Sequence, residues 1–259
     1  NSYTWPDLLS HVSEQLTGTN ELYLDAKSAC YIGGQYRYDM VGSILAEEFD
    51  RVAKADRDGK FKSVNDQFYM STEADVQVSR FKLYIAQLLS DPVIKEDRQE
   101  EIAELKKVRK NIGSIITTNY DRLIEDIFEF SPLVGNDILL SNPYGTLYKI
   151  HGCVSEPSKI IITEEDYAYF EKKYELIRAQ LLSLFIHNPI IFLGYSITDR
   201  NIREILKTIF TYVDKDSVEA TKIKENFLLV EYDEGSNNTL VSDHDIQMDG
   251  FTTIRINKL

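Results

Sequence analysis

Apolar residues follow a helical period through the first part of the chain. They recur every three or four residues in four segments, over 8–16, 40–52, 76–89 and 93–108. Because this spacing places them on one face of a helix, we predict a mainly helical part over residues 6–110. Pro92 is suited to a helix start, and the charged stretch 56–66 is typical of an exposed loop.

The pattern changes after residue 111. Short continuous apolar runs now appear over 112–117, 147–150 and 189–193. Such runs are typical of parallel strands that are covered on both faces. Helical spacing follows over 123–130 and 202–210, and two further strands are predicted over 226–230 and 251–256 with a loop at 233–238. The alternation predicts an α/β fold, a Rossmann-like mostly parallel sheet with helices on both faces, over residues 111–259.

With 259 residues and no low-complexity segment, one domain over 1–259 is the simplest organisation.

Three polar motifs each follow one of the apolar runs. They are Thr118-Asn119-Tyr120-Asp121, His151-Gly152 and Gly194-Tyr195-Ser196. Open α/β sheets bind ligands at the carboxyl ends of their strands. The sequence therefore predicts that these motifs contribute to a ligand site.

Composition excludes several classes of function. The net charge of -13 repels nucleic-acid phosphates, and we interpret the basic stretch 106–110 as the solvated end of a helix. We therefore expect no direct nucleic-acid binding. No apolar run approaches the roughly 20 residues of a membrane helix, and no signal peptide is recognisable, so we expect a soluble cytoplasmic protein. Cys30 and Cys153 lie too far apart in sequence for a paired zinc motif, and we expect both to be reduced and structural.

The ordered motifs resemble those of the sirtuin superfamily. The closer resemblance is to the zinc-less sirtuin-like domains of prokaryotic antiphage proteins, through Thr-Asn-Tyr-Asp-Arg-Leu-Ile-Glu at 118–125, Tyr-Lys-Ile-His-Gly at 148–152 and Phe-Leu-Gly-Tyr-Ser-Ile-Thr-Asp at 192–199. This resemblance implies a Rossmann-like fold without a zinc ribbon, NAD+ as the substrate and no metal. It further implies an NAD+ hydrolase that releases nicotinamide and ADP-ribose and depletes NAD during antiphage defence.

The resemblance also implies roles for individual residues. His151 would act as a base toward water or a ribose hydroxyl, and Asn119 would hold the attacking water through its amide. The remaining motif residues would contact NAD+, namely Thr118, Asp121, Gly194, Tyr195 and Ser196.

Structural roles remain open for the same side chains. His151 is equally a residue type that makes structural hydrogen bonds, and Asn119 is suited to cap a helix that starts at 120 or 121. Asp121 is an acid of the kind found in a first helical turn. We assign Thr198 or Asp199 to the cap of the following helix rather than to catalysis.

Two segments depart from the wider superfamily. Its glycine-rich strand and turn, which cradle the NAD+ pyrophosphate, would precede Asn1, so we expect a chain trimmed by about 20–40 residues and weakened in NAD+ binding. Residues 155–173 stand where sirtuin deacetylases carry a zinc ribbon. Within them, Thr163 and Asp166 have the spacing of a capping box that starts a helix.

Three other functions remain as alternatives. The chain could sense NAD or ADP-ribose without turnover, act as an NAD-dependent deacylase or ADP-ribosyltransferase, or serve as a structural scaffold. Family resemblance implies a homo-oligomer that is joined or bound to a sensor, such as an ATPase or helicase-like protein, an Argonaute-like protein or a nucleotide-sensing domain.

Overall fold

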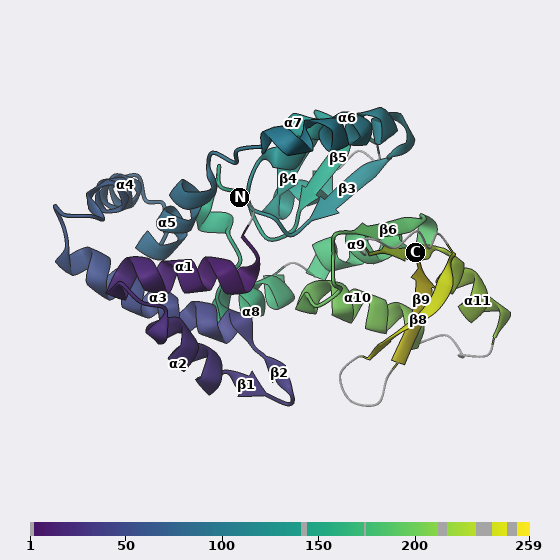
Figure 1. Ribbon diagram of the computed structural model, residues 1–259, viewed down its shortest axis with the longest axis horizontal. Helices are drawn as coiled ribbons and strands as arrows, with labels where there is room; N and C mark the ends of the chain where they lie inside the picture. The colour runs from purple at the N-terminus through teal and green to yellow at the C-terminus, as the bar shows by residue number, and fades with distance from the viewer. Residues whose placement is uncertain (1–2, 141–143, 174, 212–216, 232–239, 248–252) are drawn as a thin grey trace. The chain divides into compact units, whose positions relative to one another are not determined.

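The structure is a computed structural model that describes residues 3–140, 144–173, 175–211, 217–231, 240–247 and 253–259. The chain divides into two compact units, Asn1–Tyr174 (unit 1) and Glu175–Leu259 (unit 2). Unit 1 contains a two-stranded sheet and a three-stranded sheet, the latter teal, and unit 2 contains a four-stranded sheet that runs from green to yellow (Figure 1). A single domain over 1–259 stays a prediction, and the loop predicted at 233–238 lies outside the described residues.

Helices dominate the first part of unit 1. They are α1 (Trp5–Thr17), α2 (Glu21–Ala29), α3 (Tyr38–Ala55), α4 (Lys62–Glu73), α5 (Arg80–Leu89) and α6 (Gln99–Val108). A short antiparallel hairpin, β1 (Tyr31–Ile32) and β2 (Gln35–Tyr36), separates α2 from α3. The apolar spacing at 8–16 and 40–52 corresponds to α1 and α3, whereas α2 was not predicted.

Two predicted helices begin later than the apolar spacing indicated. Helix α5 starts at Arg80 because the Ser79 side chain accepts a hydrogen bond from the Lys82 amide at 3.2 Å and caps the first turn. Pro92 does not start a helix. The chain from 91 to 95 is non-helical, and a 3₁₀ turn, η1 (Glu96–Arg98), precedes α6.

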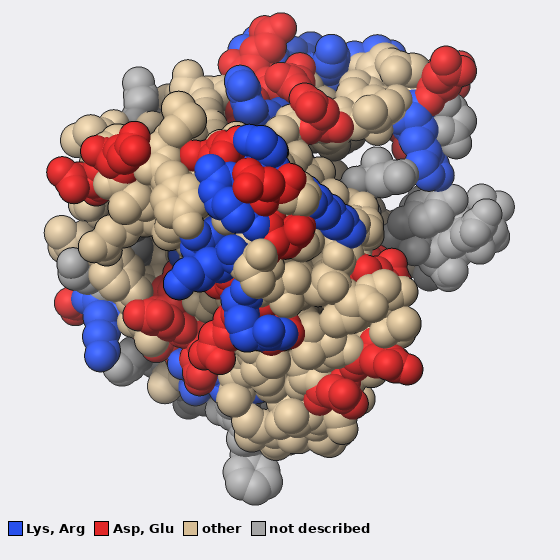
Figure 2. All heavy atoms as spheres, turned by 90° about the vertical axis from the view of Figure 1, so that its left-hand side faces the viewer, with Lys and Arg blue, Asp and Glu red and all other residues tan. Residues whose placement is uncertain are grey.

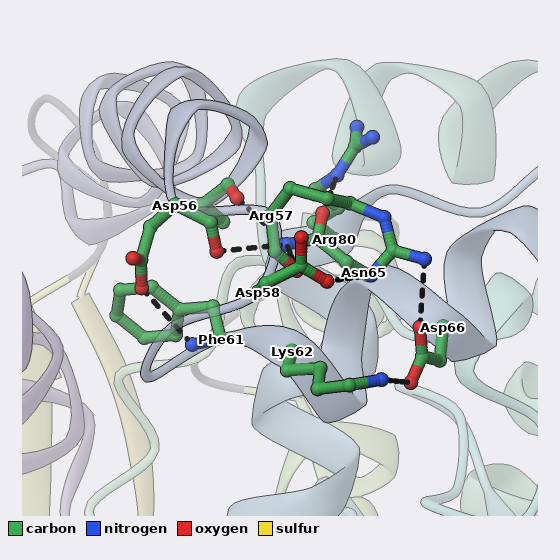
Figure 3. A network of polar contacts seen from close by, with 9 residues as sticks. Asp56, Arg57, Asp58, Phe61, Lys62, Asn65, Asp66 and Arg80 are labelled. Carbon is green, nitrogen blue, oxygen red and sulfur yellow. Dashed lines mark hydrogen bonds and ion pairs between the residues drawn. The ribbon is translucent and has the colours of Figure 1, made fainter.

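The exposed loop predicted at 56–66 is wrong in its second half, where α4 has already begun. Asn65 is fully buried there. Its Nδ2 donates to the backbone oxygens of Ala53 at 2.7 Å and Asp56 at 3.3 Å, and its Oδ1 accepts from Arg80 Nε at 2.7 Å (Figure 3). The side chain thereby joins the end of α3 to α5. Charge-rich composition predicted solvent exposure, but one buried amide closes the loop instead.

Charges of both signs surround this network. Asp66 accepts from Arg57 at 2.8 Å and from Lys62 at 2.6 Å (Figure 3). Figure 2 shows basic and acidic side chains interleaved on this side of the molecule rather than gathered into one basic surface. Exposed pairs of this kind contribute little to stability.

The sheet of unit 1 is parallel. It consists of β3 (Ser114–Thr117), β4 (Ser131–Val134) and β5 (Thr146–Lys149) in the order β3-β5-β4. Helix α7 (Leu123–Phe128) follows β3, and α6 and α7 run along one side of the sheet (Figure 1). Ile127 and Phe128 of α7 pack with Leu147 of β5 and with apolar residues of α6. The predicted α/β class with a parallel sheet and flanking helices is confirmed, although β4 and the 3₁₀ segment η3 (Gly135–Leu140) were not predicted.

The segment after β5 returns to the helical core. A 3₁₀ turn, η4 (Pro157–Lys159), leads to buried residues 160–162 and then to α8 (Glu164–Lys173). The predicted capping box is confirmed, since the Asp166 amide donates to Thr163 Oγ1 at 3.3 Å and the Thr163 amide donates to Asp166 Oδ2 at 3.0 Å. Residues 155–173 therefore carry η4 and α8 within unit 1.

Unit 2 contains a mixed sheet. Its elements are α9 (Glu175–His187), β6 (Ile190–Leu193), α10 (Arg200–Thr211), α11 (Val218–Glu225), β7 (Phe227–Val230), β8 (Ser242–Gln247) and β9 (Thr253–Lys258). The strand order is β6-β7-β9-β8, with only β8 antiparallel to its neighbour. Strand β8 was not predicted, because its sequence alternates polar and half-buried positions rather than forming an apolar run.

Both faces of β6 were predicted to be covered, and this is wrong in unit 2. Phe192 packs on Phe185 of α9 at 6.2 Å between ring centroids. On the opposite side of the strand, Ile191 and Leu193 are 65% and 64% exposed. The apolar run predicted the strand correctly but could not show which side the helices cover.

Substitution Asn65→Ala is expected to lower the free energy of unfolding by about 2–4 kcal/mol, because it leaves buried backbone oxygens and the Arg80 guanidinium without their partner. Urea denaturation followed by circular dichroism measures the change. Asn20→Ala is the matched control, since Asn20 is exposed and its side chain makes no capping hydrogen bond. Equal losses in the two variants would contradict the role given to Asn65.

Candidate functional site

Two of the three polar motifs lie at the same edge of the unit 1 sheet. Strands β3 and β5 are neighbouring and parallel, with Thr117 opposite Lys149. Each motif starts one or two residues beyond this pair, so both leave the sheet in the same direction. The structure thus brings together the predicted site residues of unit 1, which are Thr118, Asn119, Asp121 and His151.

The turn after β3 presents Asn119 to solvent. Its backbone amide donates to Thr117 Oγ1 at 3.1 Å, and its side chain is exposed. The proposed helix cap at Asn119 is wrong, because α7 begins only at Leu123. The N-cap of α7 is Arg122, which makes no side-chain capping bond. Asp121 lies just before it, where its Oδ1 accepts from the Leu123 amide at 2.9 Å. The alternative that Asp121 is an acid of the first helical turn is therefore wrong as well, since the acids of that turn are Glu125 and Asp126.

Tyr120 anchors this turn to the core. It is only 4% exposed. Its hydroxyl donates to the Ile161 backbone oxygen at 2.7 Å, and its own backbone oxygen accepts from the Val154 amide at 2.9 Å. Sequence reasoning left Tyr120 without a role, although an aromatic residue between two polar motif positions is a signal for such an anchor.

His151 is enclosed within unit 1, with 1% of its surface exposed. Its ring meets the Tyr167 ring of α8 edge-on, with 5.4 Å between the centroids and 78° between the planes. The His151 backbone oxygen accepts from the Ile161 amide at 2.9 Å. The segment 160–167, which sequence reasoning assigned only to a helix start, therefore contributes to the enclosure of the histidine.

Gly152 has a clear steric reason to follow the histidine. Its φ is +93°, in the left-handed region. A Cβ added there would lie 2.5 Å from the Lys159 backbone oxygen and 2.7 Å from the Ile160 Cα. Because both neighbours belong to the backbone, they cannot move aside as a side chain could. Only glycine lets the chain turn here while His151 stays in place.

A buried lysine connects the two motifs. Lys149 ends β5 and is completely buried. Its Nζ donates to the Asp121 backbone oxygen and to Glu125 Oε1, the latter at 3.0 Å. Sequence reasoning missed Lys149, although a charged residue inside the apolar run 147–150 is an unusual pattern.

The third motif lies in unit 2, directly after β6. Gly194 has a φ of +61°, and a Cβ placed on it would meet no atom within 4 Å. Ile197, a buried β-branched residue, also has a positive φ of +52°. Such a conformation costs about 1–3 kcal/mol and is found mainly at functional loops. Ser196 Oγ lies 3.0 Å from Thr198 Oγ1 in the same loop.

Tyr195 and Asp199 complete this loop. Burial, followed by the negative charge of Asp199, raises the pKa of the Tyr195 hydroxyl well above its ordinary value. The hydroxyl oxygen is buried and has no hydrogen-bond partner among the described residues. Asp199 Oδ1 accepts from the amides of Asn201 at 3.0 Å and Ile202 at 3.1 Å, which confirms its predicted role as a helix cap.

The structure shows no candidate metal site in the part of the chain that it describes. Within that part, no three or more His, Cys, Asp or Glu side chains are grouped to hold a metal ion. Cys30 and Cys153 are both buried and free of disulfides. Across the same described ranges, no helix has the length and apolar character needed to cross a bilayer.

The model of the SIR2-like domain family matches residues 113–248, more than half of the chain. The chain belongs to the SIR2-like domain family. The match starts at the residue before β3 and includes all three polar motifs. The predicted resemblance to sirtuin-like domains is therefore confirmed.

Curated relatives of this SIR2-like chain are named for NAD+ hydrolysis and for defence. It is 25% identical to "NAD(+) hydrolase ThsA" of Bacillus cereus over 58% of the chain and 33% of that protein. It is 32% identical to the protein of the same name from Enterococcus faecium over 42% of the chain and 25% of that protein. "Defense-associated sirtuin 2" of Bacillus subtilis is 27% identical over 43% of the chain and 12% of that protein. The matched region thus spans a third or less of each relative's length.

Substitution Gly152→Ala is expected to lower the free energy of unfolding by more than about 3 kcal/mol, because it combines a strained φ with backbone overlap. Chemical denaturation measures this loss. Gly145→Ala is the matched control, since Gly145 has a φ of +72° but no atom within 4 Å of an added Cβ. That variant should lose only about 1–2 kcal/mol. A loss at Gly152 no larger than at Gly145 would show that the close approach to Lys159 is unimportant.

Proposed function

We propose that this SIR2-like chain carries an NAD+ hydrolase site that cleaves the bond between nicotinamide and ribose and yields nicotinamide and ADP-ribose. The observation that carries the proposal is the placement of Asn119 and His151 just beyond paired residues of adjacent parallel strands. Relatives named as NAD(+) hydrolases give the reaction its chemical identity.

The reaction needs little general acid catalysis. Nicotinamide leaves as a neutral pyridine, and a positive charge develops on the ribose in an oxocarbenium-like transition state. A site for this reaction must stabilise that cation and position a water molecule. Asn119 would orient the water through its exposed amide, and His151 would accept the proton that the water loses.

Other motif residues would bind the dinucleotide. Thr118 and Asp121 would contact the nicotinamide side, with the Asp121 carboxylate favouring the ribosyl cation. The residues Gly194, Tyr195 and Ser196 of unit 2 stay predicted contacts of NAD+. There, the protonated Tyr195 hydroxyl and Ser196 can donate hydrogen bonds, and the open space beside Gly194 admits a ligand close to the backbone.

The cellular role of this reaction is depletion of NAD+ in defence against phage. The name of the Bacillus subtilis relative, "Defense-associated sirtuin 2", supports it. Because the match covers a third or less of each relative, a sensor domain or partner protein and a homo-oligomer belong to the same proposal. Binding of either would control when NAD+ is cleaved.

A sensor that binds NAD or ADP-ribose without turnover is the second candidate. The observation in its favour is the 1% exposure of His151, which leaves the ring inaccessible to a substrate in the described conformation. For hydrolysis, either the segment 160–167 must move so that the substrate reaches the His151 ring, or a neighbouring group must connect the ring to the substrate. A sensor has no such requirement.

Nicotinamide release from NAD+ by the full-length protein tests the proposal, beside the variants Asn119→Ala and His151→Ala. Each substitution should lower kcat by about 100-fold or more, because each removes a group that acts on water in the transition state. His187→Ala is the matched histidine control, since His187 is exposed at the end of α9 and lies in no motif.

The variants must match wild type in folding and oligomeric state. Asn119→Ala should leave the free energy of unfolding unchanged, because the side chain is exposed. Wild type that binds NAD+ without releasing nicotinamide, with candidate activators supplied, would support the sensor. Full activity in both variants would remove Asn119 and His151 from the mechanism.

A further inference from the structure

We propose that Lys149, paired with Glu125, is a positioning residue that fixes the Asn119 turn relative to His151. The inference rests on the proposed function and extends it to a pair of side chains that no motif includes. Neither side chain is assigned to contact NAD+. Lys149 would act through the backbone of Asp121.

Burial shows that the pair belongs to the interior. Lys149 is 0% exposed and Glu125 is 7% exposed. The ammonium of Lys149 and the carboxylate of Glu125 lie 3.0 Å apart, joining the end of β5 to α7. Cys153 Sγ lies 3.9 Å from the same carboxylate oxygen. Both charges have therefore been removed from water.

Energetics argues against a purely stabilising role for this pair. Removing two charges from water costs several kcal/mol per ion, and attraction between them repays that cost only when the other polar atoms are also satisfied. Glu125 Oε2 is buried and accepts no hydrogen bond from the described residues. Apolar side chains of similar volume commonly serve stability as well or better at such sites. A buried pair with an unsatisfied oxygen therefore calls for another explanation.

Geometry supplies that explanation. Lys149 Nζ also donates to the backbone oxygen of Asp121, two residues beyond Asn119. His151 follows Lys149 by two residues along the chain. One side chain thus ties the turn that carries Asn119 to the strand end that carries His151. Glu125 lies in the first turn of α7, and its carboxylate keeps the ammonium in this position.

Other contacts hold the same turn less directly. The Tyr120 hydroxyl and backbone oxygen bind residues 161 and 154, both beyond the histidine. They anchor Tyr120 itself, whereas Lys149 holds the following peptide through the Asp121 backbone oxygen. Loss of Lys149 should therefore loosen the turn without unfolding the sheet.

The test replaces the whole pair in the full-length protein, as Lys149→Met with Glu125→Leu. This double variant leaves no buried charge behind, so the protein should stay folded with a Tm near that of wild type. Hydrogen exchange should become faster in the peptide 118–123 and remain unchanged over 114–117. A displaced Asn119 should reduce kcat by about 100-fold with a much smaller change in KM.

Glu125→Gln serves as the control within the pair. Its amide oxygen can still accept from Lys149, so the bond to Asp121 persists and kcat per folded molecule should stay close to that of wild type. This variant should be less stable than wild type, because the lysine loses its counter-charge. A stability loss without a kcat loss separates positioning from folding.

Each outcome has a distinct meaning. Unchanged exchange over 118–123, or unchanged kcat, in a folded double variant overturns the proposal. A double variant that fails to fold also overturns it, because the pair would then be required for the fold itself. If wild type releases no nicotinamide, the proposed function fails, and the exchange comparison alone decides whether Lys149 fixes the turn.

Discussion

Parallel pairing of β3 with β5 is the constraint on which the candidate site depends. Its register sets Thr117 opposite Lys149, so the chain leaves both strands at the same level and in the same direction. A parallel ladder cannot slip by one residue without moving every buried side chain to the other face. Because β5 is buried at all four positions, a slip would also move the charged Lys149 away from Glu125 in the interior. Asn119 and His151 each follow one member of the Thr117/Lys149 pair by two residues, so the pairing sets the level at which both leave the sheet.

Around this pairing, unit 1 uses several backbone contacts to hold irregular turns in place. Gly152 packs against the backbone of Lys159, and the Tyr120 hydroxyl reaches the backbone of Ile161. These contacts all involve the segment after β5, which also carries the capping box of α8. The same segment contributes to the enclosure of His151.

Strain and buried charge gather at the motifs. Ile197 takes a positive φ in the loop of unit 2, and Lys149 and Glu125 carry charge into the interior of unit 1. Each feature costs free energy that a structure selected only for stability would avoid. Local rules are broken most often at functional sites, where geometry matters more than stability. The strained residue and the buried charges lie at or beside the family motifs, which supports a functional role for the motif regions of both units.

The sequence by itself determined the α/β class, the strand ends that carry the motifs and the membership of the SIR2-like family, because apolar runs and short motifs are local patterns. It also predicted the helix caps at Thr163 and Asp199, which need only neighbouring residues. Tertiary structure alone decided that Asn65 closes a loop, that Phe192 of β6 is buried while Ile191 and Leu193 are exposed, and that Lys149 reaches Asp121. Those outcomes depend on residues distant in sequence, and no local period records which of them will meet.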